Sequence, residues 1–426
     1  MNHSSVAPTQ PESNSGSGTQ PSKLSPALFG VAILLAVSVF INYVDRGTLA
    51  IAAPLLKDDL RLSASQLGIL LSAFFWTYAP FQIVSGWLVD KFDVNWLLAL
   101  GLLIWSLATL TTGVLHGFAL MFVVRLILGI GESVAYPSYN KIVAKHFQES
   151  QRGRANGLVS AGWAGGPALG TLVGGLLVAH VGWRLFFIVL GSASLLWLPA
   201  WIRWMPRGPG LPVSKAARPA GMFEIVTQRS AWGTFIGLFS FNYIWYFQIT
   251  WLPFYLVRQR GFSLQTMSLV GGSAFLVLAI SALLSGWFAD RWIVSTGNPT
   301  RVLKAFCGGG LALSASAFFA VFLIHDHTIA MGALILSCAS LGLGAANLWT
   351  MTQILAGPQT AGRWAGLQNF CGNIAGMVAP LLVGLIVEHT GGFFWAFAMT
   401  SAVSLLGAAG YIFVVDRVEP VQWIDG

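Results

Sequence analysis

Four charged side chains stand inside two long apolar segments of this sequence. Asp45 and Arg46 lie in the apolar run that follows the N-terminal tail, and Arg125 and Glu132 lie in a later one. A charge in mid-membrane costs roughly 2.5–3.5 kcal/mol on insertion scales and usually marks a functional site. Carboxylates take up and release protons, and a guanidinium can hold an organic carboxylate through two parallel hydrogen bonds. The two pairs therefore predict the working centre of a membrane transporter.

The spacing of these residues limits how they can pair. Arg125 and Glu132 are seven residues apart, which places them on one helix face and about 10 Å apart along the axis. Asp45 and Arg46 are adjacent and point about 100° apart, so each needs a partner on another helix. We predict that Asp45 pairs with Arg125, which leaves Arg46 free to face a central cavity beside Tyr43. A purely structural role, as ion pairs that staple helices, is the alternative.

Composition sets the class of protein. The chain has 426 residues, of which 55% are hydrophobic and 9% are charged, whereas soluble domains carry about 25% charged residues. It is therefore expected to be an integral membrane protein, and its net charge of +8 is assigned to loops that set orientation rather than to nucleic-acid binding. No nucleophile–base pair, phosphate loop or metal cluster is evident, so no enzyme activity is expected. The cysteines, expected to be small core residues without disulfides, are Cys307, Cys338 and Cys371.

Twelve apolar runs, separated by charged or Gly/Pro-rich loops, predict an all-α membrane protein with twelve transmembrane helices. The polar N-terminal residues 1–25 predict a disordered cytoplasmic tail. We expect an N-terminal six-helix bundle at 26–205, a cytoplasmic linker at 206–230, a C-terminal six-helix bundle at 231–416 and a short cytoplasmic tail at 417–426. The even number of spans and the basic loops predict that both termini are cytoplasmic, in the cell inner membrane.

Two short motifs recur in matching places of the two halves. Gly86–Lys91 (GWLVDK) closes the second span and Gly286–Arg291 (GWFADR) closes the eighth, while Arg154–Gly157 and Arg363–Gly366 open the fifth and eleventh. The repetition indicates an internal duplication, as in many secondary transporters. In the first motif the glycine is expected to allow close helix approach and the aspartate to cap or pair at a helix end. The residues predicted to act in gating are Gly86, Asp90, Lys91, Gly286, Asp290 and Arg291.

The motifs resemble those of a known transporter group. Gly86–Lys91 resembles the signature loop of the major facilitator superfamily, although Asp93 and Asn95 stand where that family commonly has a glycine and a basic residue. Asn42–Arg46 (NYVDR) is similar to the first helix of the anion:cation symporter family. That family includes bacterial permeases for galactonate, glucarate, hexuronates and phthalate, and the animal protein sialin and vesicular glutamate transporters. The resemblance implies the major facilitator fold, with inverted 3+3 repeats in each half.

Further motifs resemble the same family and imply roles for individual residues. They are Arg125-x6-Glu132-x4-Pro137 in span four and Gly366-Leu-Gln-Asn369-x3-Asn373-x2-Gly376 in span eleven. By this resemblance, Asp45 and Glu132 couple protons, Arg46 holds the substrate carboxylate, and Arg125 ties the acids to the site. The other positions expected to contact substrate are Tyr43, Tyr78, Trp163, Gln248, Trp349 and Asn369.

Trp163 departs from the galactonate permeases, which have a glutamine at the matching position. An indole removes a hydrogen-bond acceptor and adds flat apolar surface, which favours a less hydroxylated or more aromatic acid. Gln248, in span seven, is expected to restore polar contact with the substrate.

These observations predict a proton-coupled symporter that imports an organic monoanion by alternating access, with a sugar acid such as an aldonate or hexuronate as substrate. The proton is the coupling ion, no other cofactor is expected, and the protein is predicted to be a monomer. Two alternatives remain. The glycines from Gly153 to Gly170 in span five resemble a signature of antiporters, which would export an organic anion or an amphipathic drug, although helix packing also explains them. A membrane sensor would bind the anion without transporting it.

Overall fold

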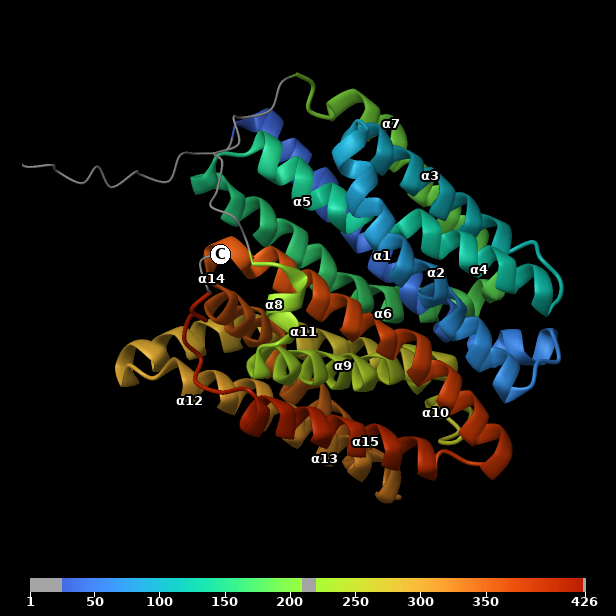
Figure 1. Cartoon of the computed structure of the whole chain (residues 1–426). Helices are drawn as coiled ribbons and strands as arrows, with labels where there is room; N and C mark the ends of the chain where they lie inside the picture. Colours follow the sequence, from blue (N-terminus) through green and yellow to red (C-terminus); the bar gives the residue numbers. More distant parts are fainter. Residues whose placement is uncertain (1–24, 209–219, 424–426) are drawn as a thin grey trace, which may run out of the picture.

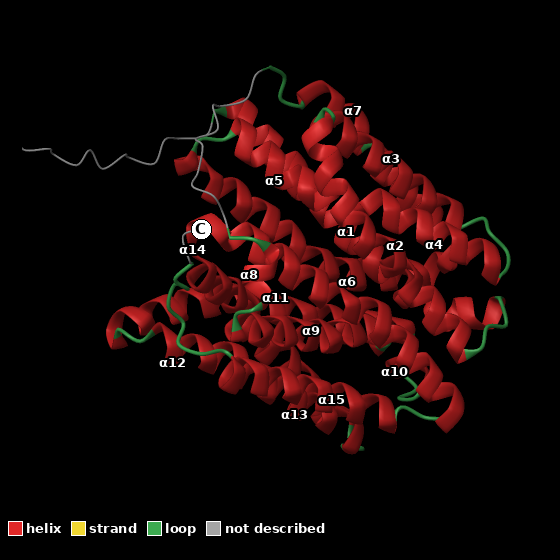
Figure 2. Ribbon diagram, viewed as in Figure 1, coloured by secondary structure: helices red, strands yellow, loops and turns green. Residues whose placement is uncertain are grey.

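The computed structural model describes residues 25–208 and 220–423. The predicted tail at 1–25, apart from Ser25, and the middle of the predicted linker lie outside the described residues. All regular structure in the described part is helical, and it contains no strand (Figure 2). The fold is therefore all-α, as the apolar runs predict.

The first half of the chain forms six membrane-length spans from seven helices. Val134 separates α4 from α5, which together make one span. Gly182, with φ 78° and ψ 165°, bends α6 between two further spans. The helices are α1 (Pro26–Asp59), α2 (Ala64–Lys91), α3 (Val94–Thr112), α4 (Phe118–Ser133), α5 (Ala135–His146), α6 (Glu149–Leu195) and α7 (Trp197–Trp204).

The second half repeats this plan. Its longest helix, α14, contains two spans that meet at Gly357, with φ 70° and ψ 168°. The elements are α8 (Met222–Val226), α9 (Arg229–Thr250), α10 (Leu252–Arg258), α11 (Leu264–Thr296), α12 (Pro299–Lys304), the π-helix η1 (Ala305–Gly309), α13 (Gly310–Leu323), α14 (His327–Thr390), α15 (Phe394–Ala409) and the π-helix η2 (Gly410–Val414).

The number of spans agrees with the twelve that the sequence predicts. Ten helical segments are long and apolar enough to cross a membrane, and one of them, Arg154–Trp204, contains two spans joined at Gly182. The span formed by α9 and α10 is not among the ten. Its sequence is interrupted by tyrosines, tryptophans and amides such as Asn242 and Gln248, which lower its hydropathy.

Local sequence signals explain where the helices of the first half begin. Ser63 and Gln66 form a capping box at the start of α2. Asp93 caps α3, since its Oδ1 accepts hydrogen bonds from the backbone N–H groups of Asn95 at 2.9 Å and Trp96 at 3.2 Å. Asp93, a departure from the family motif, thus supplies a helix cap at the turn between α2 and α3.

The helices form two groups that lie side by side (Figure 1). Helices α1–α7, drawn in blue to green, pack mainly on one another, as do α8–α15, drawn in yellow-green to red. Contacts between the groups are made chiefly by α2 against α14 and by α6 against α11. The start of α1 and the end of α15 lie at the same end of the molecule. The architecture is that of two six-span bundles, as predicted.

The two groups are in close contact at the end opposite the start of α1. A Cβ atom on Gly68 would lie 2.8 Å from the carbonyl oxygen of Pro380, so only glycine lets α2 approach α14 this closely. The backbone N–H of Ser65 donates a hydrogen bond to Glu388 Oε2 at 2.7 Å. These contacts close the interface near the α1–α2 and α14–α15 connections.

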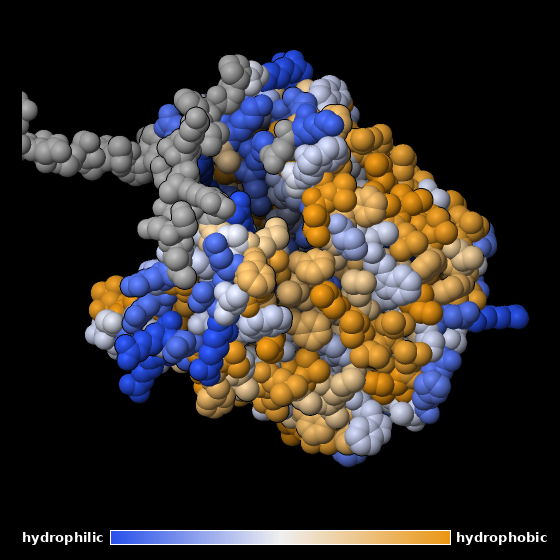
Figure 3. Space-filling view, viewed as in Figure 1, coloured by the Kyte–Doolittle hydropathy of each residue, from blue (hydrophilic) through white to orange (hydrophobic). Residues whose placement is uncertain are grey.

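An ion pair joins the two groups at the same end. Arg258 of α10 pairs with Asp58 of α1 and donates a hydrogen bond to the carbonyl oxygen of Pro54 at 2.8 Å. At the other end, where α1 starts and α15 ends, a hollow flanked by hydrophilic side chains separates the groups (Figure 3). The structure is thus closed at one end and open at the end that carries the start of α1 and the end of α15.

The predicted gating motifs differ from expectation in one respect. A Cβ atom on Gly86 would meet nothing within 4 Å, and one on Gly286 would meet only the Cβ of Ala346 at 3.8 Å. The expectation that the glycine of the first motif allows close helix approach is therefore wrong in this conformation, because this part of the helix faces open space.

The basic residues of the two motifs occupy equivalent positions. Lys91 Nζ lies 4.7 Å from the ring centre of Trp87, and Arg291 Cζ lies 4.3 Å from that of Trp287. The same i, i+4 stacking in both halves supports the predicted duplication. Asp290 is exposed, while the side chain of Asp90 is outside the described part. A gating role for these residues stays a prediction.

Candidate functional site

The four charged residues meet in the interior of the first half. Asp45 and Arg46 lie on α1, and Arg125 and Glu132 lie on α4. Asp45 and Glu132 are fully buried, Arg125 is 4% exposed, and the side chain of Arg46 is 7% exposed. Thr77 Oγ1 of α2 donates a hydrogen bond to the carbonyl oxygen of Leu126 at 2.7 Å, which holds α2 against α4 beside this cluster.

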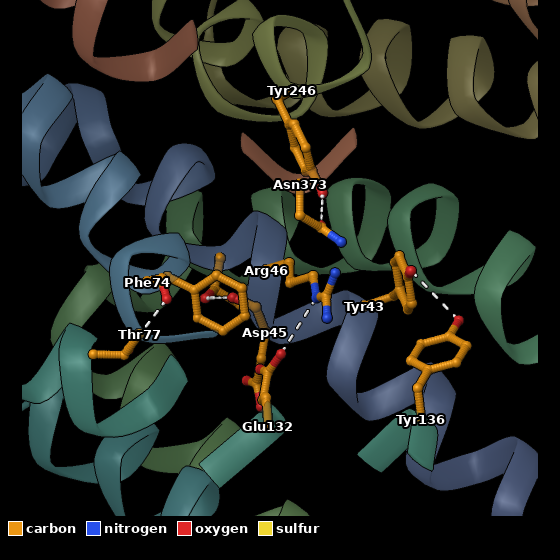
Figure 4. Close-up of polar contacts among 10 residues, drawn as sticks. Tyr43, Asp45, Arg46, Phe74, Thr77, Glu132, Tyr136, Tyr246 and Asn373 are labelled. Carbon is orange, nitrogen blue, oxygen red and sulfur yellow. Dashed lines mark hydrogen bonds and ion pairs between the residues drawn. The ribbon is translucent and has the colours of Figure 1, made fainter. Parts of the chain in front are cut away.

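One ion pair connects the two helices. Arg46 Nε donates a hydrogen bond to Glu132 Oε2 at 3.3 Å (Figure 4). In the described part of the chain no ion pair joins Asp45 to Arg125. The predicted pairing of Asp45 with Arg125, with Arg46 left free, is therefore wrong. The arginine side chain on α1 reaches Glu132 of α4, whereas the oxygens of the adjacent Asp45 have no hydrogen-bond partner among the described residues.

Many polar atoms of this cluster are buried without hydrogen-bond partners among the described residues. They include both side-chain oxygens of Asp45, both amide atoms of Asn42, Glu132 Oε1, Arg46 Nη2 and Arg125 Nε. An unsatisfied buried polar group costs about 1–3 kcal/mol, and more if it is charged. Such a concentration of unsatisfied atoms marks this cluster as the candidate site.

Aromatic rings surround the Arg46 guanidinium. Its Cζ lies 4.4 Å from the ring centre of Tyr78, 4.7 Å from that of Tyr43 and 5.2 Å from that of Phe74. Arg125 Cζ lies 5.7 Å from the Phe74 ring. Cation–π contacts of this kind stabilise a desolvated guanidinium by up to about 2 kcal/mol. The structure thus brings Tyr43 and Tyr78 beside Arg46, and their contact with substrate stays a prediction.

Trp163 extends this aromatic wall toward the second half. Its ring lies edge-on to Tyr43 with centroids 6.2 Å apart, and tilted to Trp245 of α9 with centroids 6.5 Å apart. The half-buried indole therefore faces the interior, as expected of a pocket residue. Trp245 was not predicted, because nothing in the sequence shows which of the many aromatic residues of α9 faces the first half.

Asn369 lies at the border between the halves. Its Nδ2 donates a hydrogen bond to Gln82 Oε1 of α2 at 3.4 Å, and its carbonyl oxygen accepts one from Asn373 Nδ2 at 2.9 Å. Asn373 Oδ1 in turn accepts a hydrogen bond from the Tyr246 hydroxyl at 2.9 Å (Figure 4). Asn369 is thus on the second-half side of the cluster, and the amide and hydroxyl neighbours in this network, Gln82 and Tyr246, were not predicted.

Two predicted substrate contacts are not brought to the cluster. Gln248 is fully buried inside the second half, where its Nε2 donates a hydrogen bond to Ser337 Oγ at 3.2 Å and its Oε1 accepts one from Cys338 Sγ at 3.6 Å. Both ends of the amide are therefore occupied, and Gln248 does not compensate for the indole of Trp163. Trp349 is half-buried against the hydrophobic core, and among the described residues no ring contact or hydrogen bond joins it to Arg46.

The glycines of span five have a packing function. A Cβ atom on Gly162 would lie 2.3 Å from the carbonyl oxygen of Ala36, and one on Gly166 would lie 2.5 Å from Tyr43 Cβ. Only glycine at these positions lets α6 lie directly against α1. The antiporter-like spacing is thus explained by helix packing, and it positions Tyr43 and Trp163 beside one another.

The described residues contain no group of three or more His, Cys, Asp or Glu side chains that could hold a metal ion. The chemistry available to the cluster is therefore that of carboxyl groups, guanidinium groups and aromatic rings. Together these can exchange protons and hold an anion.

Comparisons with known proteins match the chain over most of its length. The family profile of the Major Facilitator Superfamily matches residues 35–380. A probable sulfoacetate transporter of Cupriavidus necator is 31% identical over 92% of this chain and 94% of that protein. The hexuronate transporter of Bacillus subtilis is 28% identical over 92% of this chain and 94% of that protein. The crystal structure of a D-xylose–proton symporter, 13% identical, covers 92% of this chain and 99% of its own, with a TM-score of 0.76.

Proposed function

Because this chain belongs to the major facilitator superfamily, we propose that it imports an organic monoanion of the sugar-acid class together with protons. Its family and its relatives are multi-pass membrane transporters, so the chain is a transporter and not an enzyme. The observation that carries the proposal is the Arg46–Glu132 ion pair at 3.3 Å, buried among aromatic rings beside a second carboxyl group, Asp45. The pair joins a proton acceptor directly to an anion-binding group.

Protonation of Glu132 is the proposed switch for substrate binding. A neutral carboxyl group holds a guanidinium more weakly than a carboxylate does. Arg46 then turns from Glu132 to the substrate carboxylate, for which its planar fork offers two parallel hydrogen bonds. Arg46 Nη2 has no hydrogen-bond partner among the described residues, so one donor is already available.

Charge balance explains why an anion needs a proton. Asp45, Glu132, Arg46 and Arg125 carry two negative and two positive charges when all are ionised, a sum of zero. A bound monoanion adds one negative charge, and one proton on a carboxylate restores neutrality. An uncompensated buried charge costs several kcal/mol. The substrate-bound transporter therefore passes through the occluded conformation, in which the site is closed to both sides, only when at least one proton accompanies the anion.

Asp45 is the second proton site in this scheme. Both of its side-chain oxygens are buried without hydrogen-bond partners within the described residues. A carboxylate in that position is costly unless a positive group approaches it or a proton neutralises it. Arg125, on the facing helix, is the group that compensates Asp45 when the proton leaves.

The observed conformation corresponds to the inward-open state of the proposed cycle. The halves are in contact near Gly68 and Arg258, and they are separated at the end where α1 starts and α15 ends. With both termini cytoplasmic, this opening leads to the cytoplasm, where the higher pH removes the protons and releases the anion. The protein acts as a monomer in the cell inner membrane.

The test is transport by purified protein in proteoliposomes with an acidic exterior. Labelled glucuronate or gluconate is expected to accumulate inside, and the internal pH is expected to fall with uptake. Accumulation should stop when an ionophore removes the pH gradient. If substrate instead leaves preloaded vesicles while protons enter, the protein is an exporter. If substrate binds but is not transported, the protein is a sensor.

A further inference from the structure

A continuous row of aromatic rings leads away from Arg46 across the border between the halves. Tyr43 lies under the guanidinium at 4.7 Å, Trp163 follows at 6.2 Å from Tyr43, and Trp245 follows at 6.5 Å from Trp163. Phe275 of α11 supports Trp245 from behind, with ring centroids 5.5 Å apart. The row thus connects the anion-binding guanidinium of Arg46 to the indoles of Trp163 and Trp245.

The hydroxyl and amide groups near this row are engaged with one another. The hydroxyl of Tyr136 donates a hydrogen bond to that of Tyr43 at 3.4 Å, and the hydroxyl of Tyr246 donates one to Asn373 at 2.9 Å. A site that accepts an open-chain acid with hydroxyls on all sides must give those hydroxyls partners, because each unpaired buried hydroxyl lowers affinity. The row of rings offers apolar surface instead. A pyranose acid directs its hydroxyls around the ring edge and keeps C–H groups on its faces.

We propose that Trp163 and Trp245 form a stacking platform that selects acids whose carboxylate is attached to a six-membered ring. The inference rests on the proposed function, since it concerns the same anion site. A ring in the pyranose or aromatic form presents an apolar face to the two indoles while its carboxylate reaches Arg46. An open-chain aldonate has no such face and exposes its hydroxyls to the indoles. The platform therefore discriminates by shape among acids of equal charge.

The platform also links substrate binding to both halves. Trp163 belongs to α6 of the first half and Trp245 to α9 of the second. A ring stacked on both indoles contacts both halves at once. Ring-form acids thus bridge the two bodies that move relative to each other in alternating access.

The test compares glucuronate with gluconate, two acids that share charge and carbon number. Glucuronate closes into a ring and gluconate cannot. Benzoate is measured as well, as an aromatic ring acid. Binding to the purified full-length protein in detergent is measured by isothermal titration calorimetry. Wild-type protein is expected to bind at least one of glucuronate and benzoate at least tenfold more tightly than gluconate. Trp163→Gln is expected to reduce that ratio to within threefold of unity, while Trp163→Phe retains most of it.

The ratio of the affinities for ring and open-chain acids separates a loss of selectivity from general damage to the site, because general damage weakens the binding of both acids. Trp245→Gln is measured in parallel, so the inference stays open to disproof if Trp163→Gln does not fold. Equal binding of ring and open-chain acids by wild-type protein would overturn the platform, as would an unchanged ratio in a folded Trp163→Gln or Trp245→Gln variant. If acids are taken up under a pH gradient without ring preference, the platform alone fails. If no acid binds or is taken up, the proposed function fails as well.

Discussion

The two halves of this transporter have matching plans but different interiors. The first half encloses Asp45, Arg46, Arg125 and Glu132, all buried or nearly so. The buried polar residues of the second half, in its described part, are serines, threonines, asparagines and glutamines. Among the described residues, fully buried charged side chains thus belong to one bundle, and the buried polar side chains of the other are neutral. Duplication supplied two similar scaffolds, and the sequence of each was free to take a different role.

The halves also differ in which buried atoms lack hydrogen-bond partners. Among the described residues these atoms include charged groups in the first half, whereas in the second half they belong to neutral side chains, namely Gln368, Thr400, Ser401 and Tyr411. In the second half, Gln248 bonds Ser337 at 3.2 Å and the Ser337 hydroxyl lies 3.1 Å from that of Ser314. In the first half, the oxygens of Asp45 have no hydrogen-bond partner in the part of the chain that is described. Neutral hydrogen bonds can persist through the whole transport cycle, whereas unsatisfied charged groups favour a change of partner. Proton coupling should therefore be lost by changes in the first half only.

The largest effect is expected for Arg46→Lys. A lysine keeps the charge but loses the planar fork that holds a carboxylate in two places. We expect substrate affinity to fall at least 100-fold by calorimetry, with little effect from the control Arg203→Lys on the exposed face of α7. Wild-type affinity in Arg46→Lys would rule out bidentate recognition by this residue.

Asp45→Asn is expected to abolish accumulation driven by a pH gradient. The amide has a similar shape but cannot take up or release a proton. Proteoliposomes should show at least a tenfold loss of the accumulation ratio, with substrate binding within threefold of wild type. A variant that still concentrates substrate as wild type does would show that Asp45 has no part in coupling.

Glu132→Gln is expected to have a smaller effect. Replacing the carboxylate removes the ionic partner of Arg46 and imitates the protonated state, so Arg46 stays available to substrate. Net proton-driven uptake should fall, while exchange of labelled for unlabelled substrate across the membrane continues. If the variant fails to fold, the ion pair is a helix staple rather than a switch.

The smallest effect on transport is expected for Gln248→Leu in the second half. The change removes the hydrogen bonds that Gln248 makes with Ser337 and Cys338, while Ser337 keeps its bonds to Ser314. A hydrogen bond contributes about 0.5–1.5 kcal/mol of net stability. The melting temperature should fall by several degrees, while the accumulation ratio and its dependence on the pH gradient stay unchanged. Loss of proton coupling in this variant would contradict the proposal that coupling depends on the first half only.

The sequence by itself determined the fold class, the family resemblance and the membership of the charged cluster. Apolar runs long enough to span a bilayer can form only helices there, because every backbone group must be satisfied within the segment. Charges inside such runs stand out by their cost alone, so Asp45, Arg46, Arg125 and Glu132 could be identified without coordinates. The repeated motifs and the family motifs indicated the major facilitator fold, which the comparisons confirm.

Only the tertiary structure decided which groups meet. Sequence spacing fixes directions around one helix axis, but the rotation and distance of neighbouring helices depend on packing over the whole bundle. For this reason Arg46 was predicted to be free and instead pairs with Glu132, and Gln248 was predicted to face the pocket and instead lies inside the second half. For the same reason Trp245 could not be distinguished from the other aromatic residues of α9, until the two bundles placed it against Trp163.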